Sequence, residues 1–224
     1  MNKKFDPFFD VLPVSQKQLW PTLRSLSELG FVLYGGTAVA LRLGHRYSID
    51  FDFFSEKPLK RAEIKSSFDW VAHSTVLQES YDTWVMLVPV KGAEQVKVSF
   101  FGEISFGRVG EPQYTTDGVL QVASLDDLMA TKLKVILQRA EVKYYFDIAA
   151  MIKAGVRLDY GLSTARQLFG SNFQPSESLK ALTYFDDGDL ATLSLTERQI
   201  LIESARNVAD LPQVSLRSTS LASL

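Results

Sequence analysis

The sequence predicts an α+β fold, with a small mixed β-sheet of about five strands and flanking helices followed by a C-terminal helical bundle. Between residues 31 and 122, short apolar segments of strand type are separated by turn-forming residues. After Ser124 the apolar residues recur at helical spacing instead. This change of period places a boundary near residue 123.

The N-terminal part is expected to begin with a helix. Leucines three or four positions apart predict a helix over residues 15–29. Pro21 either marks its first turn or kinks it, and Gly30 is well placed to cap its end. Shorter helices are expected over residues 37–43 and 58–68.

Strands are expected wherever short apolar runs lie between turn signals. Two turns, near residues 81–82 and 91–94, predict that three consecutive strands form an antiparallel meander. Residues 102–118 carry several glycines and Pro112 and are expected to be mostly loop. The expected strands cover residues 31–34, 48–54, 74–80, 83–90, 95–101 and 119–122.

The C-terminal part is expected to be helical. Ser124 and Asp127 have the spacing of a capping box and predict the start of its first helix. The expected domains are residues 1–123 (α+β) and 124–211 (helical, closing an active-site cleft), with a flexible tail over 212–224. The expected helices cover residues 124–138, 141–154, 160–169, 176–185 and 196–211.

Composition narrows the class of protein. The chain has 224 residues, 46% of them hydrophobic, which is enough for a buried core. A net charge of −2 argues against a strongly basic nucleic-acid-binding protein. With no cysteine and only two histidines, disulfides, thiolate sites and a His-rich zinc site are excluded. No apolar run is long enough for a membrane span, and the N-terminus lacks a signal-peptide pattern, so a soluble cytoplasmic protein with no membrane partner is expected.

A glycine pair, Gly35-Gly36, lies between an expected strand and an expected helix. Glycine allows a sharp turn and a close approach of the backbone to a ligand. The free N–H groups at the start of the helix, near Thr37, favour an anion such as a triphosphate. The alternative is a tight turn with no ligand.

Two aspartates, Asp50 and Asp52, lie two residues apart in an apolar strand, so their side chains share one face. Two carboxylates held together repel each other unless a positive charge lies between them. A divalent cation, Mg²⁺ or Mn²⁺, meets this need. Ser48 lies on the same face and either contacts a phosphate or simply begins the strand. The alternative for the aspartates is a solvent-facing edge strand.

The stretch from Gly35 to Phe54 resembles the nucleotidyltransferase AbiEii/AbiGii toxin family, within the DNA polymerase β-like nucleotidyltransferase superfamily. The resemblance rests first on Gly-Gly-Thr-Ala-x-Ala-Leu followed by His-Arg-x-Ser-x-Asp-Phe-Asp-Phe-Phe. Two later segments also resemble family elements, Ala130 to Arg139 followed by Lys143 to Ile148, and Leu182 to Asp187. The resemblance covers about residues 30–187.

The resemblance implies a role for charged residues of the helical part. It places Lys132 and Asp147 in the active site, with Lys132 neutralising nucleotide phosphates. Arg139 is seven residues from Lys132 and shares its face if the helix is continuous, so it contacts phosphate or braces Asp147. The alternative is that these are solvated charges, with Lys143 and Asp147 forming an i,i+4 pair of about 0.3 kcal/mol.

Two departures from the family pattern bear on turnover. The superfamily often has a third carboxylate on a later strand, and Ser99 stands at the matching place. Serine is a poor Mg²⁺ ligand compared with a carboxylate. The first aspartate of the family's Asp-x-x-Asp is replaced by Tyr144.

The resemblance implies a metal-dependent transfer of a nucleoside monophosphate from an NTP to an acceptor hydroxyl, on RNA such as tRNA or on a protein. It also implies a toxin with a cognate antitoxin. Two alternatives stay open. One is a nucleotide-binding protein of the same fold with impaired catalysis, and the other is a phosphotransferase that passes on the γ-phosphate.

Overall fold

The computed structural model describes residues 3–92 and 94–223 and divides the chain into two compact units. The first unit comprises Met1–Gly107, Glu111–Ala123 and Thr219–Leu224, and the second comprises Arg108–Gly110 and Ser124–Ser218. The main division therefore falls after residue 123. Two short segments are exceptions, because Arg108–Gly110 belongs to the second unit and Thr219–Leu224 to the first. No helix in the described part of the chain is long and apolar enough to cross a membrane.

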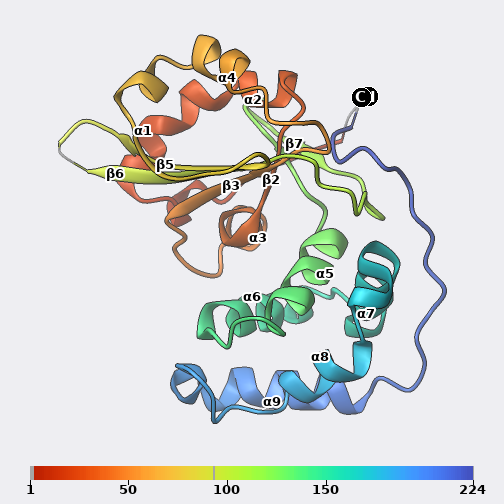
Figure 1. Cartoon of the computed structure of the whole chain (residues 1–224). Coiled ribbons are helices and arrows are strands. Elements are labelled where there is room, and N and C mark those ends of the chain that lie inside the picture. Colours follow the sequence, from red (N-terminus) through yellow and green to blue (C-terminus); the bar gives the residue numbers. More distant parts are fainter. Residues whose placement is uncertain (1–2, 93, 224) are drawn as a thin grey trace. The chain divides into compact units, whose positions relative to one another are not determined.

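The first unit is built on a mixed sheet (Figure 1). Over the described residues the sheet has eight strands in the order β1-β7-β8-β2-β3-β6-β5-β4, so the expected mixed sheet is confirmed with more strands than the five anticipated. The strands are β1 (Lys4–Phe5), β2 (Val32–Tyr34), β3 (Asp50–Phe54), β4 (Thr75–Glu79), β5 (Thr83–Pro89), β6 (Gln95–Phe101), β7 (Gln113–Thr115) and β8 (Gln121–Val122).

Strand pairing places β3 at the centre of the sheet. The strands β4, β5 and β6 form the antiparallel meander that the turns predicted. β3 pairs antiparallel with β2 and parallel with β6. The strands β1 and β7 were not expected from the sequence. They have two and three residues, too few to show an alternating pattern, and they pair with each other near one edge of the sheet.

Helices cover both faces of this sheet. Figure 1 shows α1 (Val14–Leu19), α2 (Ser25–Glu28) and α4 (Arg61–Ser67) on one face and α3 (Gly35–Leu43) on the other. The single helix expected over residues 15–29 is instead broken by a 3₁₀ turn, Trp20–Leu23. Pro21 lies in this turn, and because proline has no backbone N–H it interrupts the regular helical bonding.

The sequence of β3 separates an apolar face from an acidic face. Phe51 and Phe53 are fully buried, whereas Asp50 and Asp52 are half-buried on the opposite side of the strand. The ring of Phe51 lies 6.1 Å from that of Trp20, centroid to centroid, on the face covered by α1 and α2. The acidic face of β3 is therefore the face on which α3 packs.

The second unit is the expected helical bundle (Figure 1). Helix α5 packs on α7 and α6, and α6 packs on α9. The predicted helix start at Ser124 is confirmed, because its hydroxyl accepts a 3.1 Å hydrogen bond from the N–H of Asp127. The helices are α5 (Leu125–Val135), α6 (Val142–Lys153), α7 (Leu158–Phe169), α8 (Pro175–Ala181) and α9 (Leu195–Arg206).

The segment expected to be a flexible tail contains a packed end. Leu221 is fully buried in the first unit, and its N–H donates a 3.1 Å hydrogen bond to the Glu56 carboxylate. Ser223 and Gln121 exchange two hydrogen bonds of 2.8 and 2.9 Å. Although the Ser- and Leu-rich composition suggested disorder, specific polar partners and one buried leucine hold residues 220–223.

Candidate functional site

Gly35 forms the turn between β2 and α3 and is required there for two reasons. Its φ of +73° lies in the left-handed region that favours glycine. A Cβ at this position would also collide with the Asp52 carboxylate. The carboxylate of Asp52 therefore lies directly against the backbone at the start of α3.

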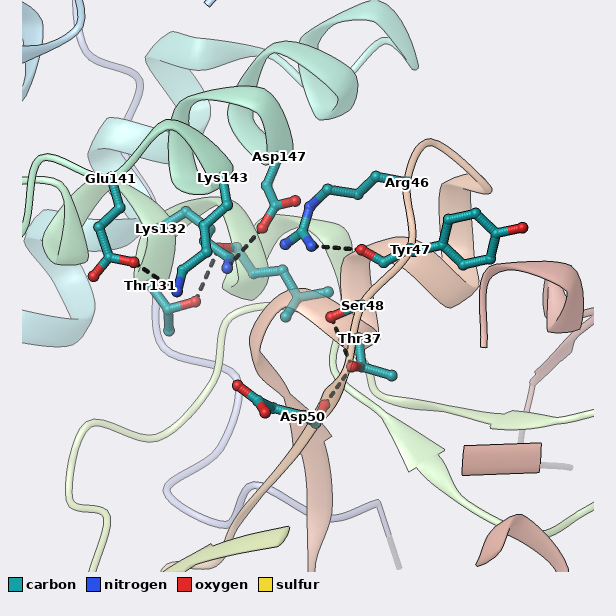
Figure 2. A network of polar contacts seen from close by, with 11 residues as sticks. Thr37, Arg46, Tyr47, Ser48, Asp50, Thr131, Lys132, Glu141, Lys143 and Asp147 are labelled. Carbon is teal, nitrogen blue, oxygen red and sulfur yellow. Dashed lines mark hydrogen bonds and ion pairs between the residues drawn. The ribbon is translucent and has the colours of Figure 1, made fainter. Parts of the chain in front are cut away.

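Gly36 allows the side chain of Arg46 to approach the same turn. A Cβ on Gly36 would lie 2.5 Å from an Nη atom of Arg46 and 3.1 Å from the Ser48 hydroxyl. The guanidinium of Arg46 also donates a 2.9 Å hydrogen bond to the carbonyl of Tyr47 (Figure 2). Sequence reasoning assigned Arg46 no role, although it lies inside the motif, four positions before Asp50.

Thr37 and Ser48 connect the start of α3 to the start of β3. The Thr37 hydroxyl donates to the backbone carbonyl of Asp50 and lies 2.9 Å from the Ser48 hydroxyl (Figure 2). Thr37 is 1% exposed and Ser48 is 7% exposed, so both hydroxyls are largely occupied by this network. These contacts hold the backbone of Asp50 in a fixed position relative to the glycine turn.

The neighbouring strand β6 supplies two residues beside the aspartates. In the parallel register, Asp50 is paired with Lys97 and Asp52 with Ser99. The ammonium of Lys97 lies 2.9 Å from Oδ2 of Asp50. Sequence reasoning missed Lys97, although it lies two residues before Ser99 and so shares its face by the period of two.

The residues at this turn fit a divalent cation held by few protein ligands. Asp50 and Asp52 offer carboxylate oxygens on one face of β3, and Lys97 contacts one oxygen of Asp50. Among the described residues, no group of three or more His, Asp or Glu side chains is arranged to hold a metal ion. Two carboxylates on one strand face are a donor set that could hold Mg²⁺ or Mn²⁺ together with water and substrate phosphates.

In the second unit, Lys132 and Asp147 form a buried ion pair. The ammonium of Lys132 on α5 lies 2.7 Å from Oδ2 of Asp147 on α6 (Figure 2). Their side chains are 5% and 0% exposed. These two residues, assigned to the active site by family resemblance, therefore also join two helices of the bundle.

Tyr144 contributes an aromatic ring to the same region. The ammonium groups of Lys132 and Lys143 lie 5.0 and 5.1 Å from the centre of its ring. Each distance is within the range of a cation–π interaction. Lys143 also contacts Glu141 at 2.6 Å. Tyr144, which replaces an aspartate of the family pattern, thus contacts the cation that pairs with Asp147.

Arg139 lies outside the helix that carries Lys132. Helix α5 ends at Val135, and Arg139 is exposed in the connection to α6. Lys132 and Arg139 were expected to share a face if the helix were continuous, and because α5 ends before Arg139 this condition is not met. A role for Arg139 in binding phosphate stays a prediction that does not depend on helix geometry.

Comparisons with known proteins identify the family of this chain. The family model described as nucleotidyl transferase AbiEii toxin, type IV TA system, matches residues 22–205. An uncharacterized protein of Aquifex aeolicus (strain VF5) is 30% identical over 181 residues, which is 77% of this chain and 84% of that relative. The matched region contains the glycine turn, both aspartates of β3 and the Lys132–Asp147 pair. The chain thus belongs to the nucleotidyl transferase AbiEii toxin family of type IV toxin–antitoxin systems.

Proposed function

We propose that this protein transfers a nucleoside monophosphate from a nucleoside triphosphate to an acceptor hydroxyl group. The observation that carries the proposal is the position of Asp50 and Asp52 on one face of β3, next to the Gly35-Gly36 turn. Carboxylates, a glycine turn and a helix N-terminus together provide for a metal and for phosphate. The family match supports the same class of reaction.

Different residues of the first unit would bind the metal ion and the phosphates. Asp50 and Asp52 would hold Mg²⁺ or Mn²⁺, which when bound supplies a Lewis acid for the phosphoryl group and charge for the departing pyrophosphate. The backbone N–H groups after Gly35 and the guanidinium of Arg46 would bind phosphate oxygens. Thr37 and Ser48 would hold the glycine turn and the start of β3 in fixed positions rather than contact the nucleotide directly.

The bonds that form and break in the proposed reaction are those of the nucleotide and the acceptor. The acceptor oxygen attacks the α-phosphorus, and the bond from that phosphorus to the bridging oxygen of the β-phosphate breaks. Pyrophosphate leaves, and the proton of the acceptor hydroxyl passes to a carboxylate of the pair. Catalysis of this kind rests on positioning and on charge stabilisation.

Lys132 and Arg139 are proposed to bind nucleotide phosphates in the same reaction, with Asp147 holding the Lys132 ammonium. The support is the resemblance of residues 130–139 and 143–148 to family elements, together with the 2.7 Å pair that orients the Lys132 ammonium. Lys132 would act as a compact positive charge. The proposed acceptor is RNA, such as tRNA, or a protein, and a cognate antitoxin is the proposed partner in the cell.

A screen with labelled nucleotides tests the proposal. The protein is incubated with Mg²⁺, total RNA and each NTP in turn, labelled either on the α- or on the γ-phosphate. Label from the α-position is expected to enter the acceptor, with release of pyrophosphate. Transfer of γ-label would instead identify a phosphotransferase. If no label moves with any nucleotide and no NTP binds, the enzyme function is wrong.

Two observations favour a second candidate, a nucleotide-binding protein without turnover. Ser99 stands where the superfamily often has a carboxylate and Tyr144 where the family pattern has one, and Lys97 contacts Asp50. Calorimetry with Mg-NTP separates the two functions. A binder would show saturable binding of the nucleotide without pyrophosphate release, whereas an enzyme would show both in the presence of its acceptor.

A further inference from the structure

The face of the sheet that carries Asp50 and Asp52 also carries a fixed positive charge. Because β3 and β6 are parallel and paired from Asp50 to Phe54, Lys97 lies beside Asp50 and Ser99 beside Asp52. Lys97 reaches Asp50 at 2.9 Å, and the two side chains are 39% and 33% exposed. The cation is therefore at the edge of the proposed metal site, where solvent and substrate have access.

The position beside Asp52 is neutral. Ser99 is 2% exposed and offers a hydroxyl, which is a weaker ligand for Mg²⁺ than a carboxylate. Strands β3 and β6 thus bring two carboxylates and one ammonium to this face, and Arg46 brings a guanidinium to the adjoining glycine turn. A site for two divalent ions about 3.5–4 Å apart needs more negative charge than this arrangement provides. Lys97 also occupies one oxygen of Asp50, so fewer carboxylate oxygens are left to bridge two ions.

We propose that the site takes one divalent ion, and that the ammonium of Lys97 supplies the positive charge that a second ion would otherwise supply. Lys97 is then a positioning residue, because it holds one oxygen of Asp50 and leaves the other to face the ion. The inference rests on the proposed nucleotidyl transfer, whose metal and phosphate sites it uses. It goes beyond that function by giving the number of ions and the role of Lys97.

An ordinary surface ion pair is the competing explanation, and the chain offers a matched control. Lys60 and Glu63 also lie 2.9 Å apart in the first unit, but they form an exposed i,i+3 pair. Lys60→Met removes the same kind of contact from a place that takes no part in the proposed site. Any effect found for Lys97→Met but not for Lys60→Met therefore belongs to the position of Lys97.

The number of ions can be measured by electron paramagnetic resonance with Mn²⁺. The full chain is titrated with Mn²⁺ in the presence of each α,β-methylene NTP analogue, which cannot release pyrophosphate. We expect one Mn²⁺ per chain, with no dipolar coupling in the spectrum. Lys97→Glu replaces the cation by a carboxylate on an exposed side chain, and it is expected to bind two ions with a coupled spectrum.

Activity gives a second readout. Lys97→Met is expected to slow transfer by roughly 100-fold, and Lys97→Arg is expected to restore most of it because it keeps the charge. Lys60→Met should leave both transfer and the Mn²⁺ count unchanged. Circular dichroism confirms that each variant is folded before either measurement.

Three results would overturn the inference. They are two coupled Mn²⁺ ions in the wild-type chain, no Mn²⁺ bound with any analogue, or full transfer activity in Lys97→Met. A wild-type chain that binds one uncoupled ion but transfers no label would count against the proposed function instead. Absence of bound Mn²⁺ together with absence of label transfer would count against both proposals, whereas two coupled ions or full activity in Lys97→Met would overturn the inference alone.

Discussion

The carboxylates of the two units occupy opposite environments. In the first unit, Asp50 is about one-third exposed and pairs with an accessible lysine. In the second, Asp147 is fully buried and its lysine partner is 5% exposed. The geometry of the two ion pairs is similar, at 2.9 and 2.7 Å, so the difference lies in the solvent around them.

The difference in exposure predicts how much stability is lost when each ion pair is broken. An exposed ion pair contributes little to stability, so it can be removed or displaced by a ligand without unfolding the protein. A buried ion pair that loses one partner leaves an uncompensated charge and destabilises the fold strongly. Loss of activity is therefore direct evidence for a functional role at Asp50, whereas at Lys132 stability must be measured alongside.

The largest expected effect is on the stability of the helical unit. Lys132→Met should lower the free energy of unfolding by about 3–5 kcal/mol, because it removes the ammonium that pairs with the buried Asp147 carboxylate. Lys180 provides the control, since its pair with Glu177 at 3.0 Å is exposed. Lys180→Met should change stability by less than about 0.5 kcal/mol. Urea denaturation followed by circular dichroism measures both.

A double variant then separates stability from function at the buried pair. Lys132→Met combined with Asp147→Leu replaces both charges by apolar groups, and it should recover most of the lost stability. Transfer activity should stay low if the ammonium contacts phosphate. Recovery of activity together with stability would show that the pair only joins α5 and α6.

In the first unit the expected effect is on activity rather than stability. Asp52→Asn should reduce nucleotidyl transfer by roughly 100- to 1000-fold, because an amide is a weaker metal ligand and carries no charge. Its melting temperature should stay close to that of the wild type. Asp69 is exposed in the same unit and away from the site, so Asp69→Asn is the matched control. Equal losses in both variants would contradict the assignment.

A smaller effect is expected at the glycine turn. Gly35→Ala should cost about 1–2 kcal/mol for the positive φ alone, and more because its Cβ would collide with Asp52. Gly92 has a φ of +89° and nothing within 4 Å of an added Cβ, so Gly92→Ala isolates the backbone cost. Denaturation gives the stability difference. Equal losses would mean that Asp52 moves aside freely.

The smallest effect concerns acid stability. Burial raises the pKa of Asp117, but hydrogen bonds from Thr115, Trp20 and the N–H of Val119 outweigh it, so the pKa lies below its usual 3.8. A carboxyl with a lowered pKa stabilises the fold above the unfolded-state value, and this stabilisation is lost as the pH falls through the folded-state value. Asp117→Asn should therefore lose less stability than the wild type between pH 5 and 2, measured by denaturation at each pH.

Much of the first unit could be predicted from local pattern. The alternation of Asp and Phe in β3 predicted one acidic and one apolar face, and the structure shows both. The meander from β4 to β6 followed from its turns. By contrast, the sequence allowed Pro21 either to mark the first turn of the helix or to kink it. The 3₁₀ turn that the structure has at this position could not be chosen from local pattern.

The contacts that complete the site depend on register and could not be predicted in the same way. The Lys97–Asp50 pair requires that β3 and β6 be neighbours with Asp50 opposite Lys97, which no local pattern fixes. Arg46 reaches the glycine turn through an irregular loop. The buried end of the tail at Leu221 likewise depends on a partner, Glu56, that is far away in the sequence.

The most direct test of the central claim is to count products in one reaction. Wild-type protein and Asp52→Asn are each given the preferred NTP, Mg²⁺ and acceptor, and both pyrophosphate and acceptor-linked nucleotide are measured. The predicted result is one pyrophosphate for each nucleotide transferred by the wild type, and almost none of either from Asp52→Asn. Wild-type protein that binds Mg-NTP but yields neither product, or that releases only inorganic phosphate, would contradict nucleotidyl transfer.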